Sequence, residues 1–306
     1  MKGAFRQGKP AQAYLLWGSP RCDFLAAGRF LAQSFLCEKG GLACGQCPTC
    51  RRFSEGVHPD FIQLDGFDSA IRKDDVEALK NAFAMTAVES KGRMVYLIAA
   101  CGNMTNEAAN SLLKFLEEPA PGITAILTTS NLETVLPTIV SRCETVKLQP
   151  LSREDIYHAL AARYSPEISY FLSDYSGDSE RLEKAAGDEG FAKAAALAND
   201  FILSLEQGRA PAAYTLLSAA ASGLPDSRCY NWFYGDVSRF LGDAIAQGGR
   251  FGPYGAEIEN FGRKQQALAA RMQVFLQESL RMSTANLSFT GVLAQLAQMI
   301  LRPDGR

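Results

Sequence analysis

The sequence predicts an α/β domain built on a parallel β-sheet, followed by two all-helical domains. In the first half of the 306-residue chain, short apolar runs alternate with helix-like segments, and after Pro150 these runs disappear. Such strand–helix alternation is typical of a parallel sheet with helices on both faces. The chain is longer than one average domain, and its 47% hydrophobic residues are enough for substantial cores.

Five segments of the first half are expected to form the strands. Each is short, apolar or β-branched, and each lies between segments with a helical pattern. They are Tyr14–Trp17, Phe61–Leu64, Met94–Ile98, Ala125–Thr128 and Thr145–Leu148.

Two helices of this region have clear sequence signals. An amphipathic stripe predicts one helix over Asp74–Ala87. A second helix is predicted over Thr105–Glu118, where Thr105 suits the N-cap and Glu107 lies in the first turn, which favours negative charge. Pro119 is expected to end this helix.

The second half begins with the capping-box-like start Ser152-Arg153-Glu154-Asp155 and is rich in alanine and leucine. Glycines interrupt the helical pattern at several points, including Gly208-Arg209-Ala210-Pro211. We therefore assign residues 1–150 to the α/β domain, 151–204 to a small helical domain and 205–306 to a helical bundle.

Charge and hydropathy exclude several classes of protein. The net charge is −2 and the pI is near 5.9, so the overall field does not attract nucleic acid or anionic lipid. No apolar run has the length of a membrane span, and residues 1–9 do not resemble a secretory signal. We expect a cytoplasmic protein without a membrane partner, in a reducing compartment where clustered cysteines favour metal binding over disulfides.

Four cysteines form the most specific metal signal of the chain. Cys37, Cys44, Cys47 and Cys50 follow the pattern C-x6-C-x2-C-x2-C. Thiolates hold Zn²⁺ tetrahedrally, and a C-x2-C step lets one tight turn supply two ligands. Because four protein ligands leave no open position for water, we expect a structural zinc ion rather than a catalytic one.

Two alternatives to this ligand set exist. His58 is the only rival ligand, but His58-Pro59-Asp60 leads directly into a predicted strand, so we expect a capping or packing role for it. The other alternative is four unliganded thiols in a loop. The close clustering, with glycines and a proline between the cysteines, favours zinc.

A phosphate-binding loop is expected where the first strand turns into a helix, but its chemistry is lost. The turn reads Gly18-Ser19-Pro20-Arg21-Cys22-Asp23-Phe24-Leu25, whereas a working loop reads G-x-x-x-x-G-K-[ST]. Asp23, Phe24 and Leu25 thus replace glycine, lysine and the hydroxyl residue. Asp23 would repel phosphate, Phe24 cannot neutralise it, and Leu25 cannot bind Mg²⁺.

A second nucleotide element is missing after the third strand. That strand runs into Ala99-Ala100-Cys101, where acidic residues would hold Mg²⁺. One loss alone is compatible with a working enzyme. The two losses together predict that this chain does not hydrolyse ATP, and we expect neither ATP nor Mg²⁺ in it.

Several segments resemble the clamp-loader branch of the AAA+ family. Asn110–Pro119 (NSLLKFLEEP) is similar to the family's L-L-K-x-L-E-E-P helix, and Leu136–Cys143 (LPTIVSRC) contains its Ser-Arg-Cys motif. The cysteine cluster followed by His58-Pro59-Asp60 resembles the zinc module that bacterial tau/gamma and delta-prime subunits share. The resemblance covers residues 1 to about 150, and the helical remainder agrees in length and class.

This resemblance implies an AAA+-like α/β domain, a lid domain over 151–204 and a collar domain over 205–306 that packs with other collars in a ring-like hetero-oligomer. The altered phosphate loop is similar to that of delta-prime subunits, because tau/gamma subunits keep working nucleotide motifs. The implied partners are the tau/gamma and delta subunits of DNA polymerase III. The sliding clamp and primed DNA would be reached through the complex.

The resemblance also implies a role for Arg142. In the family, the arginine of the Ser-Arg-Cys motif enters the nucleotide site of the neighbouring subunit as an arginine finger. There, a guanidinium stabilises charge on the transferring phosphoryl group. Outside that context, Arg142 would be interpreted as a surface ion pair near the start of a strand.

Two other functions are kept as alternatives. One is an active AAA+ ATPase of the tau/gamma type with an unusual phosphate loop, which would bind ATP. The other is a stand-alone zinc-dependent DNA-binding protein, which would bind DNA tightly and in a salt-sensitive way. The acidic pI opposes the second.

Overall fold

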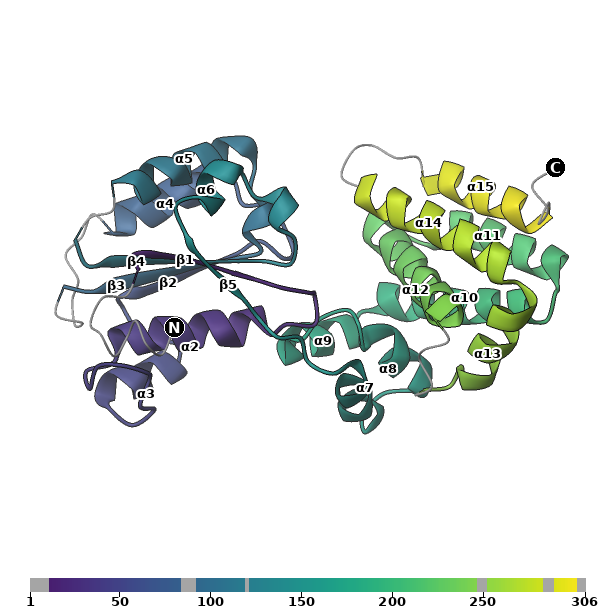
Figure 1. The fold of residues 1–306 in the computed structure, drawn as a ribbon, viewed down its shortest axis with the longest axis horizontal. Coiled ribbons are helices and arrows are strands. Elements are labelled where there is room, and N and C mark those ends of the chain that lie inside the picture. Colours follow the sequence, from purple (N-terminus) through teal and green to yellow (C-terminus); the bar gives the residue numbers. More distant parts are fainter. Residues whose placement is uncertain (1–10, 84–91, 119–120, 247–251, 283–288, 302–306) are drawn as a thin grey trace. The chain divides into compact units, whose positions relative to one another are not determined.

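The computed structural model describes residues 11–83, 92–118, 121–246, 252–282 and 289–301 (Figure 1). The chain divides into two compact units, Met1–Leu151 and Ser152–Arg306. Each unit has hydrophobic clusters of its own.

The first unit is built on a five-stranded sheet in which every pair of neighbouring strands is parallel. The strand order is β2-β3-β4-β1-β5. Both the predicted parallel α/β class and the five predicted strands are confirmed. The strands are β1 (Ala13–Trp17), β2 (Phe61–Asp65), β3 (Met94–Ala99), β4 (Ile123–Thr129) and β5 (Glu144–Lys147).

The strand register aligns the carboxyl ends of three strands at one edge of the sheet. Trp17, the last residue of β1, pairs with Thr129 of β4 and with Lys147 of β5. In open parallel sheets, ligands bind outside the carboxyl ends of the strands, where the strand order changes direction. A nucleotide would therefore be expected at this edge.

Helices cover both faces of the sheet (Figure 1). Leu25, Leu31 and Phe35 of α2 belong to a core cluster with β3 residues such as Leu97, and the opposite face packs against α4 and α5. The helices are α2 (Phe24–Leu36), α3 (Pro48–Ser54), α4 (Lys73–Phe83), α5 (Asn106–Glu117) and α6 (Pro137–Val140), with two 3-10 turns, η1 (Cys101–Asn103) and η2 (Leu132–Thr134).

The helix signals of the sequence agree with these elements. Thr105 is the N-cap of α5, and its hydroxyl oxygen accepts a hydrogen bond of 3.2 Å from the backbone N–H of Ala108. Residues 84–87 of the predicted Asp74–Ala87 helix and the predicted stop at Pro119 lie outside the described residues.

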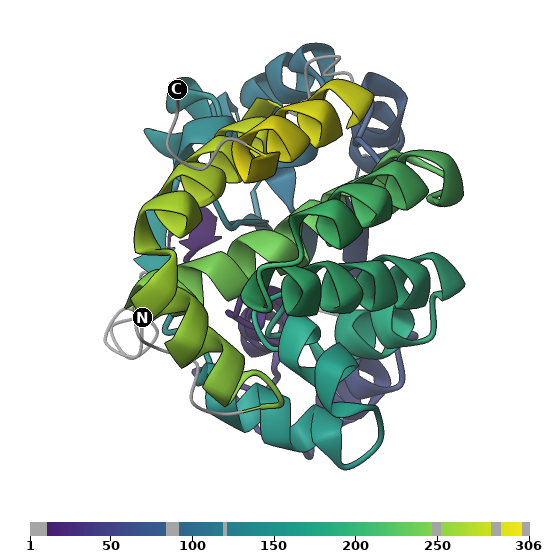
Figure 2. The ribbon, with the colours of Figure 1, turned by 90° about the vertical axis from the view of Figure 1, so that its right-hand side faces the viewer.

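The second unit is all-helical throughout its described residues, as predicted (Figures 1 and 2). Ser152 caps its first helix by accepting a hydrogen bond from the N–H of Asp155. The helices are α7 (Arg153–Ala161), α8 (Pro166–Leu172), α9 (Ser179–Ala186), α10 (Glu189–Glu206), α11 (Ala210–Gly223), α12 (Ser227–Ala246), α13 (Gly255–Lys264), α14 (Gln266–Met282) and α15 (Phe289–Leu301).

One hydrophobic core runs through this unit, from Ile156 of α7 to Ile300 of α15. Helix α10 crosses the predicted boundary between residues 204 and 205, and it packs against both α8 and α12. The further division into a lid over 151–204 and a collar over 205–306 therefore stays a prediction.

A buried ion pair links the beginning of this unit to its centre. Arg153 Nη1 of α7 donates to Asp243 Oδ1 of α12 at 2.7 Å, and the Tyr170 hydroxyl donates to the other carboxylate oxygen at 2.5 Å. The side chains of Arg153 and Asp243 are 16% and 14% exposed. Burial raises the pKa of Tyr170 above its ordinary value, so its hydroxyl stays a donor.

We expect Asp243→Ala to lower the free energy of unfolding by about 3 kcal/mol, because it leaves the buried Arg153 charge without its carboxylate. Urea denaturation followed by circular dichroism measures this change. Asp200→Ala, which removes an exposed carboxylate from α10, is the matched control and should change the free energy by less than about 0.5 kcal/mol. Equal losses in the two variants would contradict the structural role of the pair.

Candidate functional site

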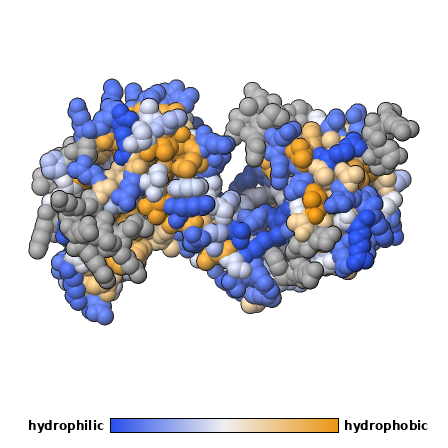
Figure 3. Space-filling model, viewed as in Figure 1, coloured by the Kyte–Doolittle hydropathy of each residue, from blue (hydrophilic) through white to orange (hydrophobic). Residues whose placement is uncertain are grey.

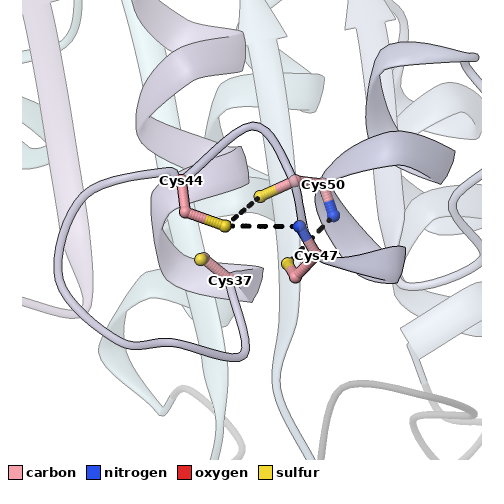
Figure 4. A group of neighbouring side chains, drawn as sticks. All are labelled: Cys37, Cys44, Cys47 and Cys50. Atoms are coloured by element: carbon pink, nitrogen blue, oxygen red, sulfur yellow. Dashed lines mark hydrogen bonds between the residues drawn. The ribbon is translucent and has the colours of Figure 1, made fainter.

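The four cysteines of the predicted metal site converge in the structure. Their sulfur atoms all lie within 4.8 Å of one another, and they point toward a common centre (Figure 4). A tetrahedral zinc ion with Zn–S bonds of about 2.3 Å needs sulfurs roughly 3.8 Å apart. The Cys44 and Cys50 sulfurs are 4.0 Å apart, so the cluster fits a tetrahedral ion with only small adjustments.

The cluster joins the end of one helix to the beginning of the next. Cys37 is the C-cap of α2, while Cys47 is the N-cap of α3 and its sulfur accepts from the backbone N–H of Cys50 at 3.4 Å. The Cys44 sulfur accepts from the N–H of Cys47 at 3.4 Å. Between them Gly45 has a φ of +70°, a left-handed conformation that favours glycine and closes the tight turn.

The backbone around the sulfurs favours thiolates, the form that ligates metal. The pKa of Cys44 is lowered to about 6 because the backbone N–H groups of Gln46 and Cys47 donate toward its sulfur. Despite the burial of Cys47, hydrogen bonds lower its pKa, whereas burial raises the pKa of Cys50 to about 12.

Helix α2 holds this module in place. The Gln33 side-chain amide donates to the carbonyl of Cys50 at 3.0 Å, and the Ser34 hydroxyl oxygen accepts from the N–H of Ala43 at 3.0 Å. Cys37, Cys47 and Cys50 are buried, and Cys44 is half-buried.

His58 is not part of the cluster. Its buried Nδ1 accepts a hydrogen bond of 3.2 Å from the backbone N–H of Asp60, directly before β2. This contact agrees with the predicted capping role, and the group of possible ligands found among the described residues contains the four cysteines alone.

The turn from β1 to α2 has the expected position but not the chemistry of a phosphate loop. Asp23 is the N-cap of α2, and its Oδ1 accepts a hydrogen bond of 2.9 Å from the backbone N–H of Ala26. A phosphate group at a helix N-terminus binds to these same N–H groups. The Asp23 carboxylate satisfies one of these N–H groups from within the chain.

The two residues after Asp23 point into the protein. Phe24 is 4% exposed and Leu25 is 5% exposed, and Leu25 belongs to the core cluster of this sheet face. A lysine and a serine at these positions would have to be accessible to a nucleotide. The structure thus uses both residues for packing.

The turn itself packs closely on the segment after β5. A Cβ added to Gly18 would lie 2.6 Å from the Cys22 sulfur and 3.1 Å from the Leu148 carbonyl oxygen. The Arg21 guanidinium donates to the carbonyl of Leu151 at 2.8 Å. These contacts tie the turn to the segment after β5.

The end of β3 offers no metal ligand of its own. Ala100 has a φ of 51°, and its N–H donates to the Thr128 hydroxyl at 3.1 Å. Ala99 accepts from the N–H of Gly66 at 3.0 Å. Alanines therefore stand at the end of β3, tied by hydrogen bonds to Thr128 of β4 and to Gly66 after β2.

A cleft of about 650 Å³ remains at the carboxyl edge of β1, β4 and β5. Lys147 lies over the Trp17 ring, with its Nζ 5.0 Å from the ring centroid. Other lining residues include Ser19, Ser130 and Glu133, but not Asp23, Phe24 or Leu25. The cleft is thus lined by the beginning of the β1–α2 turn, Gly18 and Ser19, but not by the first residues of α2.

Arg142 lies on the surface, just after α6. Its Nη2 donates to Glu117 Oε1 at 2.6 Å, and its Nη1 donates to the carbonyl of Thr138 at 2.9 Å. The side chains of Arg142 and Glu117 are 35% and 46% exposed. The surface ion pair is therefore present, and the guanidinium stays accessible from outside the chain.

Of Asp23 and Glu117, only the first had a role that could be read from the residue pattern. The sequence shows Asp23 as a missing glycine, but an aspartate before a helix is also a preferred N-cap, and that signal was available. Glu117 had no such signal, because its partner lies 25 residues away and only the fold brings the two together.

Known proteins match the α/β half of the chain. Residues 1–152 match the protein family described as "DNA polymerase III, delta subunit". A Bacillus subtilis protein named DNA polymerase III subunit delta' is 38% identical over 184 residues, 58% of this chain and 55% of the relative. The chain belongs to the clamp-loader family of DNA polymerase III subunits.

Other members of the clamp-loader family are also similar to this chain. The gamma subunit of Buchnera aphidicola subsp. Schizaphis graminum is 34% identical over 191 residues, 59% of this chain and 52% of that protein. The chain thus spans about half the length of these curated relatives. A gamma subunit-related protein from Thermotoga maritima has a TM-score of 0.45 at 16% identity, covering 97% of this chain and 95% of that one.

Both units have large exposed apolar side chains on their surfaces, among them Phe30, Val57, Tyr214, Val274 and Leu301. On the face shown in Figure 3, hydrophilic and apolar residues are mixed. Within the described residues, no helix combines the length and apolar character needed to cross a bilayer.

We expect Asp23→Ala to lower the free energy of unfolding by about 1 kcal/mol, because the N–H of Ala26 loses its acceptor. Asp23→Asn keeps a side-chain oxygen at the N-cap and should stay within about 0.5 kcal/mol of the parent. Chemical denaturation of the purified chain compares the two variants. Equal losses would show that the hydrogen bond to α2 is not what Asp23 contributes.

Proposed function

We propose that this chain is a subunit of the DNA polymerase III clamp-loader complex that does not itself hydrolyse ATP. The observation that carries this proposal is the Asp23 carboxylate bound at the N-terminus of α2. It stands where the phosphates of a nucleotide would bind, and it repels them. The buried Phe24 and Leu25, and the alanines after β3, support the same conclusion.

The chain would instead act on the nucleotide site of a neighbouring subunit through Arg142. Its guanidinium is accessible, and it follows a short helix at the surface. A planar guanidinium with several N–H donors suits the charge that develops on a transferring phosphoryl group. The Ser-Arg-Cys context of Arg142 in this family supports the role of an arginine finger in trans.

The proposed partners are the tau/gamma and delta subunits, and the complex as a whole would load the sliding clamp onto primed DNA. The relatives of this chain carry the names of delta', gamma and tau subunits. Tyr214 of α11, Val274 of α14 and Leu301 of α15 are exposed apolar residues of the helical unit. They offer contact area for the collar helices of other subunits.

The cysteine cluster would hold one Zn²⁺ ion through Cys37, Cys44, Cys47 and Cys50. The ion would cross-link α2, the loop after it and α3, and the closed thiolate set leaves no position for a substrate. Its role would therefore be structural.

In the assembled loader, Arg142→Ala should slow ATP hydrolysis at the one site that receives this arginine by about 10³-fold or more. The total ATPase rate should fall by the fraction of hydrolysis that takes place at that site, while the size of the complex should not change. Arg142→Lys keeps the charge but loses the planar fork, so it should rescue only part of the rate. Single-turnover ATPase assays measure the rate, and size-exclusion chromatography measures the size of the complex. An unchanged rate would contradict the arginine-finger role of Arg142.

Binding assays on the isolated chain distinguish this function from the two alternatives. The isolated chain should neither bind a fluorescent ATP analogue at micromolar concentration nor hydrolyse ATP. Micromolar binding would favour an active ATPase subunit instead. Tight binding of primed DNA by the isolated chain, lost as salt rises, would favour a stand-alone DNA-binding protein.

Replacing Cys44 and Cys47 together with serine should remove the zinc and lower the free energy of unfolding by more than about 2 kcal/mol, because metal binding contributes to folding. Metal analysis and thermal melting test this, and a chelator should destabilise the parent in the same way. Cys143→Ser, a change outside the cluster, should leave the metal content unchanged. A double variant as stable as the parent would mean that the cluster is not a structural site.

A further inference from the structure

We propose that Glu117 is a positioning residue for Arg142: it holds the guanidinium at the surface in the orientation needed by the neighbouring nucleotide site. This inference rests on the proposed function of Arg142 as an arginine finger. It adds a residue of the L-E-E-P segment to the machinery, although that residue would not touch the nucleotide.

The contacts of Arg142 are divided between two elements. Thr138, whose carbonyl accepts from Nη1 at 2.9 Å, belongs to the four-residue helix α6. Glu117, whose carboxylate accepts from Nη2 at 2.6 Å, is the last residue of α5. A guanidinium has five N–H donors, so these two contacts hold the group while leaving donors for a phosphate.

Helix α5 packs directly on the sheet. Ala108 and Leu112 on its inner face are fully buried, and the Phe115 ring stacks on that of Tyr96 in β3 with centroids 5.4 Å apart. Glu117, at the end of this helix, thereby connects Arg142 to an element that is anchored in the core of the domain.

The location of Glu117 is not explained by the stability of its own helix. A carboxylate in the last turn of a helix interacts unfavourably with the negative end of the helix dipole. Glu118 follows directly and carries a second negative charge, and Lys114 is the one basic residue in that turn. The Arg142 guanidinium is the cation that makes Glu117 favourable here.

Holding the Arg142 guanidinium in position before it meets the phosphoryl group affects the rate of ATP hydrolysis at the neighbouring site. An arginine side chain that moves freely loses rotamer freedom when it binds a phosphoryl group, and a pre-positioned one loses less. Removing the Glu117 carboxylate should therefore reduce the benefit of Arg142 without abolishing it. An exposed ion pair contributes little to folding stability, so the fold should be unaffected.

The test is a double-mutant cycle in the reconstituted loader. Glu117→Gln should lower the kcat of ATP hydrolysis at the site that receives Arg142 by roughly two- to tenfold. The KM for ATP and the melting temperature should be unchanged. When Arg142→Ala is already present, Glu117→Gln should cause no additional loss.

Glu118→Gln is the matched control, because it removes the same charge from the adjacent residue and should leave kcat unchanged. Equal effects of the Glu117 and Glu118 variants, a faster rate with Glu117→Gln, or losses that add to that of Arg142→Ala would each overturn the inference. If Arg142→Ala has full activity, the proposed function fails as well. If Glu117→Gln has full activity while Arg142→Ala does not, the arginine-finger role of Arg142 is supported and the positioning role of Glu117 is contradicted.

Discussion

The hydrogen bond between the Asp23 carboxylate and the N–H of Ala26 is the contact on which the functional interpretation depends. A parallel sheet of this order leaves a helix N-terminus at its carboxyl edge, and that end of a helix attracts an anion. In this chain the Asp23 carboxylate binds there. Under the proposed function, this side chain would take the place of the nucleotide phosphates.

The residues around Asp23 are used for contacts within the chain. Phe24 and Leu25 are buried, and Leu25 packs with the core on this face of the sheet. Asp23 binds the N-terminus of α2, and Arg21 binds the carbonyl of Leu151. In the same domain, the proposed arginine finger Arg142 is paired with Glu117, the last residue of α5.

The cysteine cluster also ties segments of this domain together, at the carboxyl end of α2. It ties the end of α2 to the beginning of α3 over a loop that contains several glycines in the left-handed conformation. Such a loop would lose much conformational entropy on folding, and the proposed zinc ion, bound by four thiolates, would compensate for this loss. Through it, the site would stabilise a segment that has little apolar core of its own.

Much of this molecule could be predicted from local sequence signals. The five strands, the caps at Thr105 and Ser152 and the clustering of Cys37, Cys44, Cys47 and Cys50 depend on residues close together in the chain, and such interactions leave patterns of fixed spacing. The ion pair of Arg142 with Glu117 and that of Arg153 with Asp243 left no such pattern. The two members of each pair lie on different elements far apart in the chain, and the packing of those elements depends on the shape and volume of many side chains at once, so only the tertiary structure decided which charges meet.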